Sequence, residues 1–309
     1  MTGEAMEGRP ASRAAPAEDV VRTVVALVAL AVLCIVAGAA VGNVESGATA
    51  SASTPRPAPL RYDLALGDSL AAGVGASAPA RGYVGLLYEH ERRRMPGLRL
   101  VDLACPGATT TSFTAGGGCS YAQPSQLAAA EAFLRDHRSQ VAFVTLDIGL
   151  NDVDSCMSTV EVDEACVADG LQQADRGLRG ILAGVGRADP DAPVIGSDYY
   201  DPFLAAWADG GSGQSVALQS EVGIVALNGV LSRAYGDAGM AVAPVAARFA
   251  TVDTDAGTTA SDDTPADVRH VCAWTWMCAT GNLHPNDAGY AQLAAAFAAV
   301  LPTRPVRAR

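Results

Sequence analysis

The chain has 309 residues, and half of them are hydrophobic, which is enough for one sizeable core or two small ones. Its formal net charge is −12. An acidic chain with no cluster of Lys or Arg gives a phosphate backbone nothing to bind, so the composition argues against nucleic acid as a partner. No group of Asp, Glu and His has the spacing of metal ligands, and we expect neither a metal nor another cofactor.

The N-terminal part of the chain carries an uncharged apolar run, residues 24–41. At ~1.5 Å per residue in a helix the run is about 27 Å long, close to the thickness of a bilayer's hydrocarbon core. It predicts either a cleaved signal peptide or an uncleaved signal anchor over residues 23–42, and the anchor would hold the protein on the membrane. Under both interpretations the following domain is exported. We expect it to be secreted or to lie on the extracellular face of the cell membrane.

Composition divides the rest of the chain into four parts. Residues 1–22 form a flexible N-terminal segment, and residues 43–59 form a linker rich in Ser, Pro and Ala that cannot bury a core. A globular domain is expected over residues 60–303, followed by a tail over 304–309. Nothing in the sequence indicates an obligate partner, and we expect a monomer.

Cysteine usage agrees with export. One of the seven Cys, Cys34, lies inside the apolar run, and the other six fall into three couples that are close in sequence: Cys105 and Cys119, Cys156 and Cys166, Cys272 and Cys278. Six Cys permit 15 pairings, so the connectivity stays open. Pairing within each couple is the simplest expectation, because each brackets a loop rich in Gly, Ser or Asp, and disulfides suit an oxidising compartment. A zinc site is the rival, but no Cys/His spacing supports it.

From residue 61 on, short apolar stretches alternate with stretches of helical spacing. In chain order we predict strand 61–67, helix 83–94, strand 98–104, helix 123–137, strand 141–149, helix 165–188, strand 192–200, helix 215–236, strand 239–246 and helix 286–300. The alternation predicts a parallel sheet of about five strands with helices on both faces, a three-layer α/β/α domain. The long segments 201–214 and 250–281 show no clear pattern and could be functional loops or lids.

Ser69 is the first candidate for chemistry. In such sheets, binding sites form beyond the carboxyl ends of the strands, and the first strand runs into Gly67-Asp68-Ser69-Leu70. A hydroxyl at the start of the following helix lies where helix N–H groups can stabilise an oxyanion. The alternative is an ordinary Asp/Ser helix cap.

Two further polar segments follow the second and third strands. Gly107, in Cys-Pro-Gly-Ala-Thr-Thr, could offer an unobstructed backbone N–H, although it could equally be a plain turn glycine. Asn151, in Gly-Leu-Asn-Asp, could point an amide donor over the strand ends or form an Asx turn. Near the C-terminus, His284 lies on a loop just before the last predicted helix, as a general base supplied from the rim of a site would.

These four segments, in this order and each at a strand or helix boundary, resemble the SGNH hydrolases, also called GDSL lipases or esterases, over roughly residues 61–300. The resemblance implies a flavodoxin-like α/β/α fold and hydrolysis of esters. It makes Ser69 the nucleophile and one oxyanion donor, Gly107 and Asn151 the other two donors, and His284 the general base. The six-Cys layout and the Cys-Pro-Gly-Ala-Thr-Thr segment are most similar to the actinobacterial secreted branch.

One position departs from that pattern. The family usually has an Asp three residues before the His, to orient its ring, whereas this chain has Gly281. Some members use a main-chain carbonyl instead, so the resemblance implies a Ser–His dyad in which the Gly281 carbonyl, or a neighbour in the 279–282 turn, accepts from the imidazole. A Cys272–Cys278 disulfide would stiffen this turn. The rival orienting groups are four nearby carboxylates: Asp262, Asp263, Asp267 and Asp287.

The expected activity is hydrolysis of a small-molecule or lipid carboxylic ester. Removal of acetyl groups from extracellular glycans is a second enzymatic alternative. A catalytically silent surface-binding module is a third, which the missing Asp favours and the joint presence of Ser69, Gly107, Asn151 and His284 argues against. Large side chains in or near the two unpatterned segments could line an acyl pocket or simply belong to the core. They are Tyr199, Tyr200, Phe203, Trp207, Trp274, Trp276 and Met277.

Overall fold

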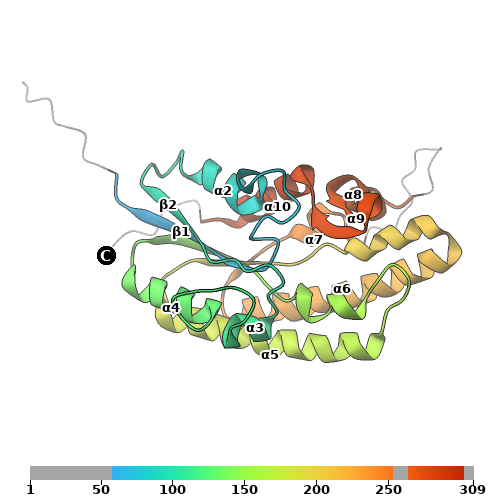
Figure 1. The fold of residues 1–309 in the computed structure, drawn as a ribbon. Coiled ribbons are helices and arrows are strands. Elements are labelled where there is room, and N and C mark those ends of the chain that lie inside the picture. The colour runs from blue at the N-terminus through green and yellow to red at the C-terminus, as the bar shows by residue number, and fades with distance from the viewer. Residues whose placement is uncertain (1–57, 253–263, 303–309) are drawn as a thin grey trace, which may run out of the picture. The chain divides into compact units, whose positions relative to one another are not determined.

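The computed structural model describes residues 58–252 and 264–302 (Figure 1). The predicted signal segment 23–42, the N-terminal segment and the C-terminal tail lie outside the described residues, as does nearly all of the linker. The described domain holds a five-stranded sheet in which all strands are parallel, as the alternation of elements predicts.

The five strands lie where the apolar stretches predict them. They are β1 (Arg61–Gly67), β2 (Leu98–Asp102), β3 (Val141–Asp147), β4 (Val194–Ser197) and β5 (Ala241–Ala243). Their order across the sheet is β2-β1-β3-β4-β5, so the direction of winding reverses between β1 and β3. Every residue of β3 is buried, because helices cover the central strand on both faces. A crevice for a ligand is expected beyond the carboxyl ends at such a reversal.

Helices form the two outer layers (Figure 1). One face of the sheet carries α2 (Tyr83–Glu91), α7 (Val245–Arg248), α8 (Ala266–Trp274) and α10 (Asp287–Val300). The other carries α3 (Thr110–Ala115), α4 (Gln126–Asp136), α5 (Glu164–Ala188) and α6 (Gly211–Asp237). The three-layer α/β/α architecture is therefore confirmed.

The long helices α5 and α6 show why the layers hold together. The buried positions of α5 recur every three or four residues, as in Ala174, Leu178, Ile181 and Val185, and form an apolar stripe toward the core. Among the described helices, α6 alone is long and apolar enough to cross a bilayer. Its buried face packs on α5 and on the segment Pro202–Asp209, so core packing accounts for its composition.

The two unpatterned segments are more ordered than the sequence predicts. The 3₁₀ helix η4 (Pro202–Asp209) and the first turn of α6 occupy most of 201–214. The described part of 250–281 contains α8, the short helix α9 (Met277–Thr280) and β6 (Thr275–Trp276), which pairs antiparallel with β7 (Asn282–Pro285). Most of these elements are too short for a hydrophobic period to register, so the expectation of long loops is corrected for 201–214 and for the described part of 250–281.

Three further short elements flank the strand ends: η1 (Pro79–Arg81), η2 (Leu150–Asp152) and η3 (Asp154–Cys156). All three disulfides join the sequence-near couples, Cys105–Cys119, Cys156–Cys166 and Cys272–Cys278. The pairing expected from the sequence is confirmed, and it leaves these six Cys unable to serve as zinc ligands.

Candidate active site

The sheet order brings three of the predicted site residues to neighbouring strand ends. Gly107 follows β2, Ser69 follows β1, and Asn151 lies in η2, the turn that follows β3. These strands are adjacent in the order β2-β1-β3. Because the carboxyl ends of parallel strands meet at one edge, the three residues share that edge at the point where the winding reverses.

The turn that carries Ser69 is anchored to the core by a side-chain amide. Gln126, the first residue of α4, accepts a hydrogen bond from the Gly67 N–H (2.8 Å) and donates one to the Gly67 carbonyl (3.0 Å). Gln126 is buried, and so is Ser69, which is 8% exposed. A buried amide that satisfies both backbone groups of the last strand residue fixes the direction in which the chain leaves the sheet.

Two buried carboxyl groups lie beneath this turn. Asp68 accepts from the Leu70 N–H (2.9 Å) and from the Tyr199 hydroxyl (3.2 Å). Asp147, at the end of β3, accepts from the Ala71 N–H (3.2 Å) and from the Tyr83 hydroxyl. Burial raises the pKa of Asp68 to about 6. Burial, and then the proximity of Asp68, raise the pKa of Asp147 well above its ordinary value. The pair therefore tends to retain a proton, because two adjacent buried carboxylates repel each other.

The backbone donors expected at an oxyanion hole are unpaired. Within the described residues, neither the Ser69 N–H nor the Gly107 N–H donates a hydrogen bond. Gly107 has a left-handed φ of +77°, and no atom lies within 4 Å of the place where a Cβ would stand. The space beside Gly107 is therefore open.

The Asn151 amide and its neighbour join the loops after β2 and β3. Asn151 Nδ2 donates to the Ala108 carbonyl (2.9 Å), which uses one of its two amide hydrogens. Asp152 is buried and accepts from both the N–H (2.9 Å) and the hydroxyl (2.8 Å) of Thr110. These bonds hold Asn151 at a set position beside Gly107, with a second amide hydrogen left to donate.

His284 reaches the same edge from the C-terminal part of the chain. It lies in β7 and is half-buried, and burial lowers the pKa of its imidazole. Gly75 lies against it: a Cβ on Gly75 would stand 2.6 Å from the Pro285 carbonyl oxygen and 3.0 Å from His284 Cβ. Only a glycine permits this approach. No hydrogen bond joins Ser69 and His284 within the described residues.

Several hydrogen bonds fasten the Ser69 turn to the His284 segment. The Ser69 carbonyl accepts from the Val74 N–H (3.0 Å), and the Val74 carbonyl in turn accepts from the Tyr290 hydroxyl (2.6 Å). The Trp276 indole N–H donates to the Gly75 carbonyl (2.8 Å). Ser77 adds two bonds to Asp287 at the start of α10. The structure thus brings the predicted nucleophile and base onto directly connected segments.

The group that contacts the imidazole Nδ1 differs from the sequence-based expectation. Asn282 Oδ1 lies 2.6 Å from His284 Nδ1, so a side-chain amide takes the position that we assigned to the Gly281 carbonyl. Gly281 has another function, since its left-handed conformation (φ +73°) ends α9. Of the rival carboxylates, Asp287 is bonded to Ser77 and Asp267 is buried in α8. Asp262 and Asp263 lie outside the described residues.

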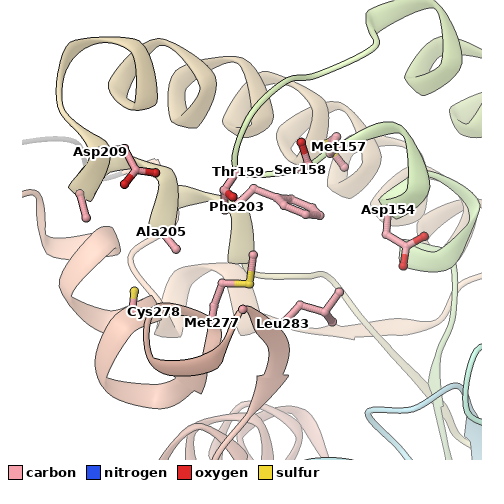
Figure 2. A pocket seen from close by; sticks show the side chains of 12 residues that line it. Asp154, Met157, Ser158, Thr159, Phe203, Ala205, Asp209, Met277, Cys278 and Leu283 are labelled. Carbon is pink, nitrogen blue, oxygen red and sulfur yellow. The ribbon is translucent and has the colours of Figure 1, made fainter.

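A cleft of about 510 Å³ lies among η3, η4 and the α9–β7 segment (Figure 2). Its lining is close in sequence to Asn151 and His284 but includes neither of them, nor Ser69 or Gly107. Met277 and Leu283 project into it from the α9–β7 side, and Phe203 faces them from η4. Asp154 and Asp209 stand at its two ends (Figure 2). The other lining residues are Met157, Ser158, Thr159, Ala205, Ala208, Cys278 and Gly281. The lining contains two carboxylates and no Lys, Arg or His.

Only part of the predicted acyl-pocket set lines this cleft. Phe203 and Met277 do, whereas Tyr199 and Tyr200 are fully buried. The Tyr200 hydroxyl donates to the Leu283 carbonyl (2.7 Å), next to His284. The remaining Trp residues serve packing or tethering: Trp207 and Trp274 pack against the core, and Trp276 bonds Gly75.

Sequence reasoning missed several supporting residues. Asp147 ends a mainly apolar strand, which is an unusual place for a carboxylate and is a signal that could have identified it. Gln126 and Asn282 carry no local signal, because their importance comes from distant or irregular partners. Among the described residues, no three His, Cys, Asp or Glu side chains are grouped as a metal ion would need.

Comparison of the sequence and the fold with known proteins shows which family the chain belongs to. No curated protein matches the sequence. Two solved structures share the fold: an extracellular lipase from Streptomyces rimosus (20% identity, 77% of this chain and 99% of that chain covered, TM-score 0.51) and a lipase from the goat rumen metagenome (18%, 79% and 99%, TM-score 0.52). The profile of the GDSL-like Lipase/Acylhydrolase family matches residues 65–292, from the Ser69 turn through His284. The chain belongs to the GDSL-like lipase/acylhydrolase family.

Proposed function

We propose that the protein hydrolyses carboxylic esters outside the cell through an acyl intermediate on Ser69. The observation that carries the proposal is the convergence at one sheet edge of a serine, two unpaired backbone N–H groups and an anchored amide, with a histidine on the adjoining segment. A serine hydroxyl becomes an effective nucleophile only when a base takes its proton, and we propose His284 as that base.

The reaction follows from these groups. His284 Nε2 takes the proton of the Ser69 hydroxyl as its oxygen attacks the ester carbonyl. The oxyanion that forms accepts hydrogen bonds from the Ser69 N–H, the Gly107 N–H and the Asn151 amide. The imidazolium then gives its proton to the departing alkoxide, which leaves as the alcohol. Water repeats the sequence with the acyl-serine, releasing the acid and restoring Ser69.

The electrostatics of the site favour a neutral base. Burial lowers the pKa of His284, so the imidazole is unprotonated at neutral pH and ready to accept a proton. The raised pKa of the Asp68–Asp147 pair limits the negative charge next to the nucleophile. With less negative charge beside Ser69, the oxyanion that forms on the substrate meets less electrostatic repulsion.

The cleft of Figure 2 is the proposed binding place for the substrate's acyl or alcohol group. Phe203, Met277 and Leu283 in its lining suit the apolar part of a lipid or another small-molecule ester, and its volume lies in the range of small-ligand sites. Asp154 and Asp209 repel anions, and no lining cation offsets them. We therefore favour uncharged ester groups over phosphate-bearing ones.

Extracellular location is supported by the three disulfides, which persist in oxidising compartments. The apolar run 24–41 is the proposed signal peptide or membrane anchor. A protein of the same fold, the Streptomyces rimosus lipase, is described as extracellular. We propose a monomer that needs no cofactor.

Hydrolysis of p-nitrophenyl butyrate by the wild type, Ser69→Ala and the control Ser215→Ala tests the function. Ser215 is exposed on α6 and serves as a matched serine outside the site. We expect turnover by the wild type and the control, and loss of turnover in Ser69→Ala. Acetate release from acetylated xylan, without cleavage of longer acyl esters, would instead identify a glycan acetylesterase. Inactivity on every ester would favour the surface-binding alternative.

A further inference from the structure

Asn282 contacts His284 twice through a single atom. Its Oδ1 accepts from the His284 backbone N–H (3.0 Å) and lies 2.6 Å from the imidazole Nδ1. A backbone N–H can only donate, so the oxygen of the amide, and not its nitrogen, must face His284. The same oxygen then requires that Nδ1 carries the proton.

This contact sets the tautomer of the base. With the proton on Nδ1, the lone pair of Nε2 is free to accept the proton of the Ser69 hydroxyl. We propose that Asn282 is the positioning residue of His284, its neutral side-chain oxygen standing in for the carboxylate that the family usually supplies. The inference rests on the proposed function of Ser69 and His284 and assigns the third member of that set.

The local structure holds the Asn282 side chain where it is needed. Asn282 pairs with Trp276 across the β6–β7 ladder. The turn between them is closed by the hydrogen bond from the Gly281 N–H to the Met277 carbonyl (2.8 Å). The Cys272–Cys278 disulfide ties α9 to α8 just before this turn. Because these constraints fix the backbone, the contact with His284 costs only the rotamer freedom of the Asn282 side chain itself.

A neutral orienting group has a consequence that a carboxylate lacks. A carboxylate at hydrogen-bond distance stabilises the imidazolium and raises the pKa of a histidine, whereas an amide carries no net charge. Here burial is what shifts the pKa of His284, and it lowers it. The free base therefore persists to lower pH than in a site with a buried Asp.

Other charged groups around His284 are engaged elsewhere. Asp287 on α10 is bonded to Ser77, and Asp68 lies buried beneath Ser69 with its own donors. Asp154 stands at one end of the cleft. Two tyrosines also approach this region, and both are uncharged because burial raises their pKa values: Tyr200 and Tyr290. Asn282 is thus the described side chain that hydrogen-bonds the ring.

The kinetic test compares Asn282→Ala and Asn282→Asp with Asn286→Asp. In Asn282→Ala we expect kcat to fall about 10- to 100-fold with little change in KM. This loss is smaller than the about 10⁴-fold of a buried triad carboxylate, because water can reach the exposed Nδ1. Asn282→Asp should retain most of the wild-type kcat. Its carboxylate should move the acid limb of the pH profile of kcat/KM up by about one pH unit. Asn286→Asp adds the same charge at the cap of α10 and should shift the limb less.

A second readout does not depend on turnover. In protein labelled with ¹⁵N-histidine, NMR should show the Nδ1-protonated tautomer for His284, assigned by its loss in His284→Gln, and a mixed tautomer in Asn282→Ala. A kcat within twofold of wild type together with an unchanged tautomer in Asn282→Ala would overturn the inference. So would equal losses in the Ala and Asp variants without a shift of the acid limb. A wild type that is inactive on esters yet shows the predicted tautomers would contradict the proposed function and leave the positioning contact standing.

Discussion

The nucleophile side and the base side of the site are built in different ways. Ser69, Gly107 and Asn151 follow three adjacent strands and are held by buried groups such as Gln126 and Asp152. His284 instead lies in a two-stranded ladder outside the main sheet, oriented by an exposed amide and tied down by a disulfide. The first side takes its geometry from the core, whereas the second takes it from local tethers.

Substitutions on the two sides should therefore affect stability and activity differently. A group anchored by the sheet is displaced only when the core rearranges, so changes near it should cost stability together with activity. A group held by local tethers can lose its alignment while the domain stays folded.

Replacing His284 by Ala should have the largest effect. Without a base, the Ser69 hydroxyl keeps its proton, and we expect kcat to fall by about 10⁴-fold or more. The melting temperature should change little, because His284 is half-buried and lies outside the main sheet. Steady-state hydrolysis and thermal unfolding measure the two quantities. A fall in melting temperature as large as that of a core variant would contradict the proposed difference between the Ser69 side and the His284 side.

Replacing Asn151 by Ala should have the next largest effect. It deletes one oxyanion donor and the bond to the Ala108 carbonyl. We expect kcat to fall about 10²- to 10³-fold, roughly 3–4 kcal/mol of transition-state stabilisation, with a smaller change in KM. Stability should also drop measurably, unlike in His284→Ala. Unchanged kcat in a folded variant would remove Asn151 from the proposed oxyanion hole.

The disulfides of the two sides should separate stability from activity. Cys105–Cys119 spans 14 positions, and closing a loop of this size stabilises the fold by about 3 kcal/mol. Cys272–Cys278 spans only 6 and should contribute less. We expect the double Cys→Ser variant of the first pair to lose more unfolding free energy in urea. The double Cys→Ser variant of Cys272–Cys278 should lose more kcat for each kcal/mol of unfolding free energy that it loses. The reverse ranking would contradict the proposal that local tethers align His284.

The two sides should also respond oppositely to pH. The pKa of Asp68 is raised to about 6, so the folded state holds a proton that the unfolded state releases near pH 4. Stability from this group is therefore lost as pH rises from about 4 through 6. The pKa of His284 is lowered, so its contribution is lost as pH falls below about 6.5.

Urea unfolding at pH 4.5 and 7.5 measures this difference. Relative to wild type, Asp68→Asn should gain on the order of 2 kcal/mol of unfolding free energy between the two pH values, since it cannot ionise. Relative to wild type, His284→Gln should lose unfolding free energy between the same two pH values, by a smaller amount than Asp68→Asn gains. If the unfolding free energies of the wild type and of Asp68→Asn change equally between the two pH values, the raised pKa of Asp68 is contradicted.

The smallest predicted effect concerns the cleft. Met277→Trp should fill the space between Met277 and Phe203 and lower kcat/KM for long acyl esters about 10-fold relative to acetate esters. Val222→Trp is the matched control, since Val222 is 71% exposed on α6 and does not line this cleft. Equal chain-length profiles in the two variants would show that the substrate binds elsewhere.

The contrast between the two sides also explains what the sequence could predict. The strands and long helices follow from runs and periods of apolar residues, as in the fully buried β3. Ser69, Gly107 and Asn151 could then be placed together because strand order and strand ends determine their positions. Asn282 could not be identified, since the choice between a backbone carbonyl, a carboxylate and an amide depends on the geometry of one short turn. The ordered η4 and α8 were missed for a different reason: each is too short for a hydrophobic period to register in the sequence.

Covalent labelling shows whether Ser69 is a nucleophile activated by His284. A fluorophosphonate probe should add to the wild type at a single site, which peptide mass spectrometry should locate at Ser69. Labelling should disappear in Ser69→Ala, slow strongly in His284→Ala, and stay unchanged in Ser215→Ala. An unlabelled wild type, or an adduct on a different residue, would contradict the account.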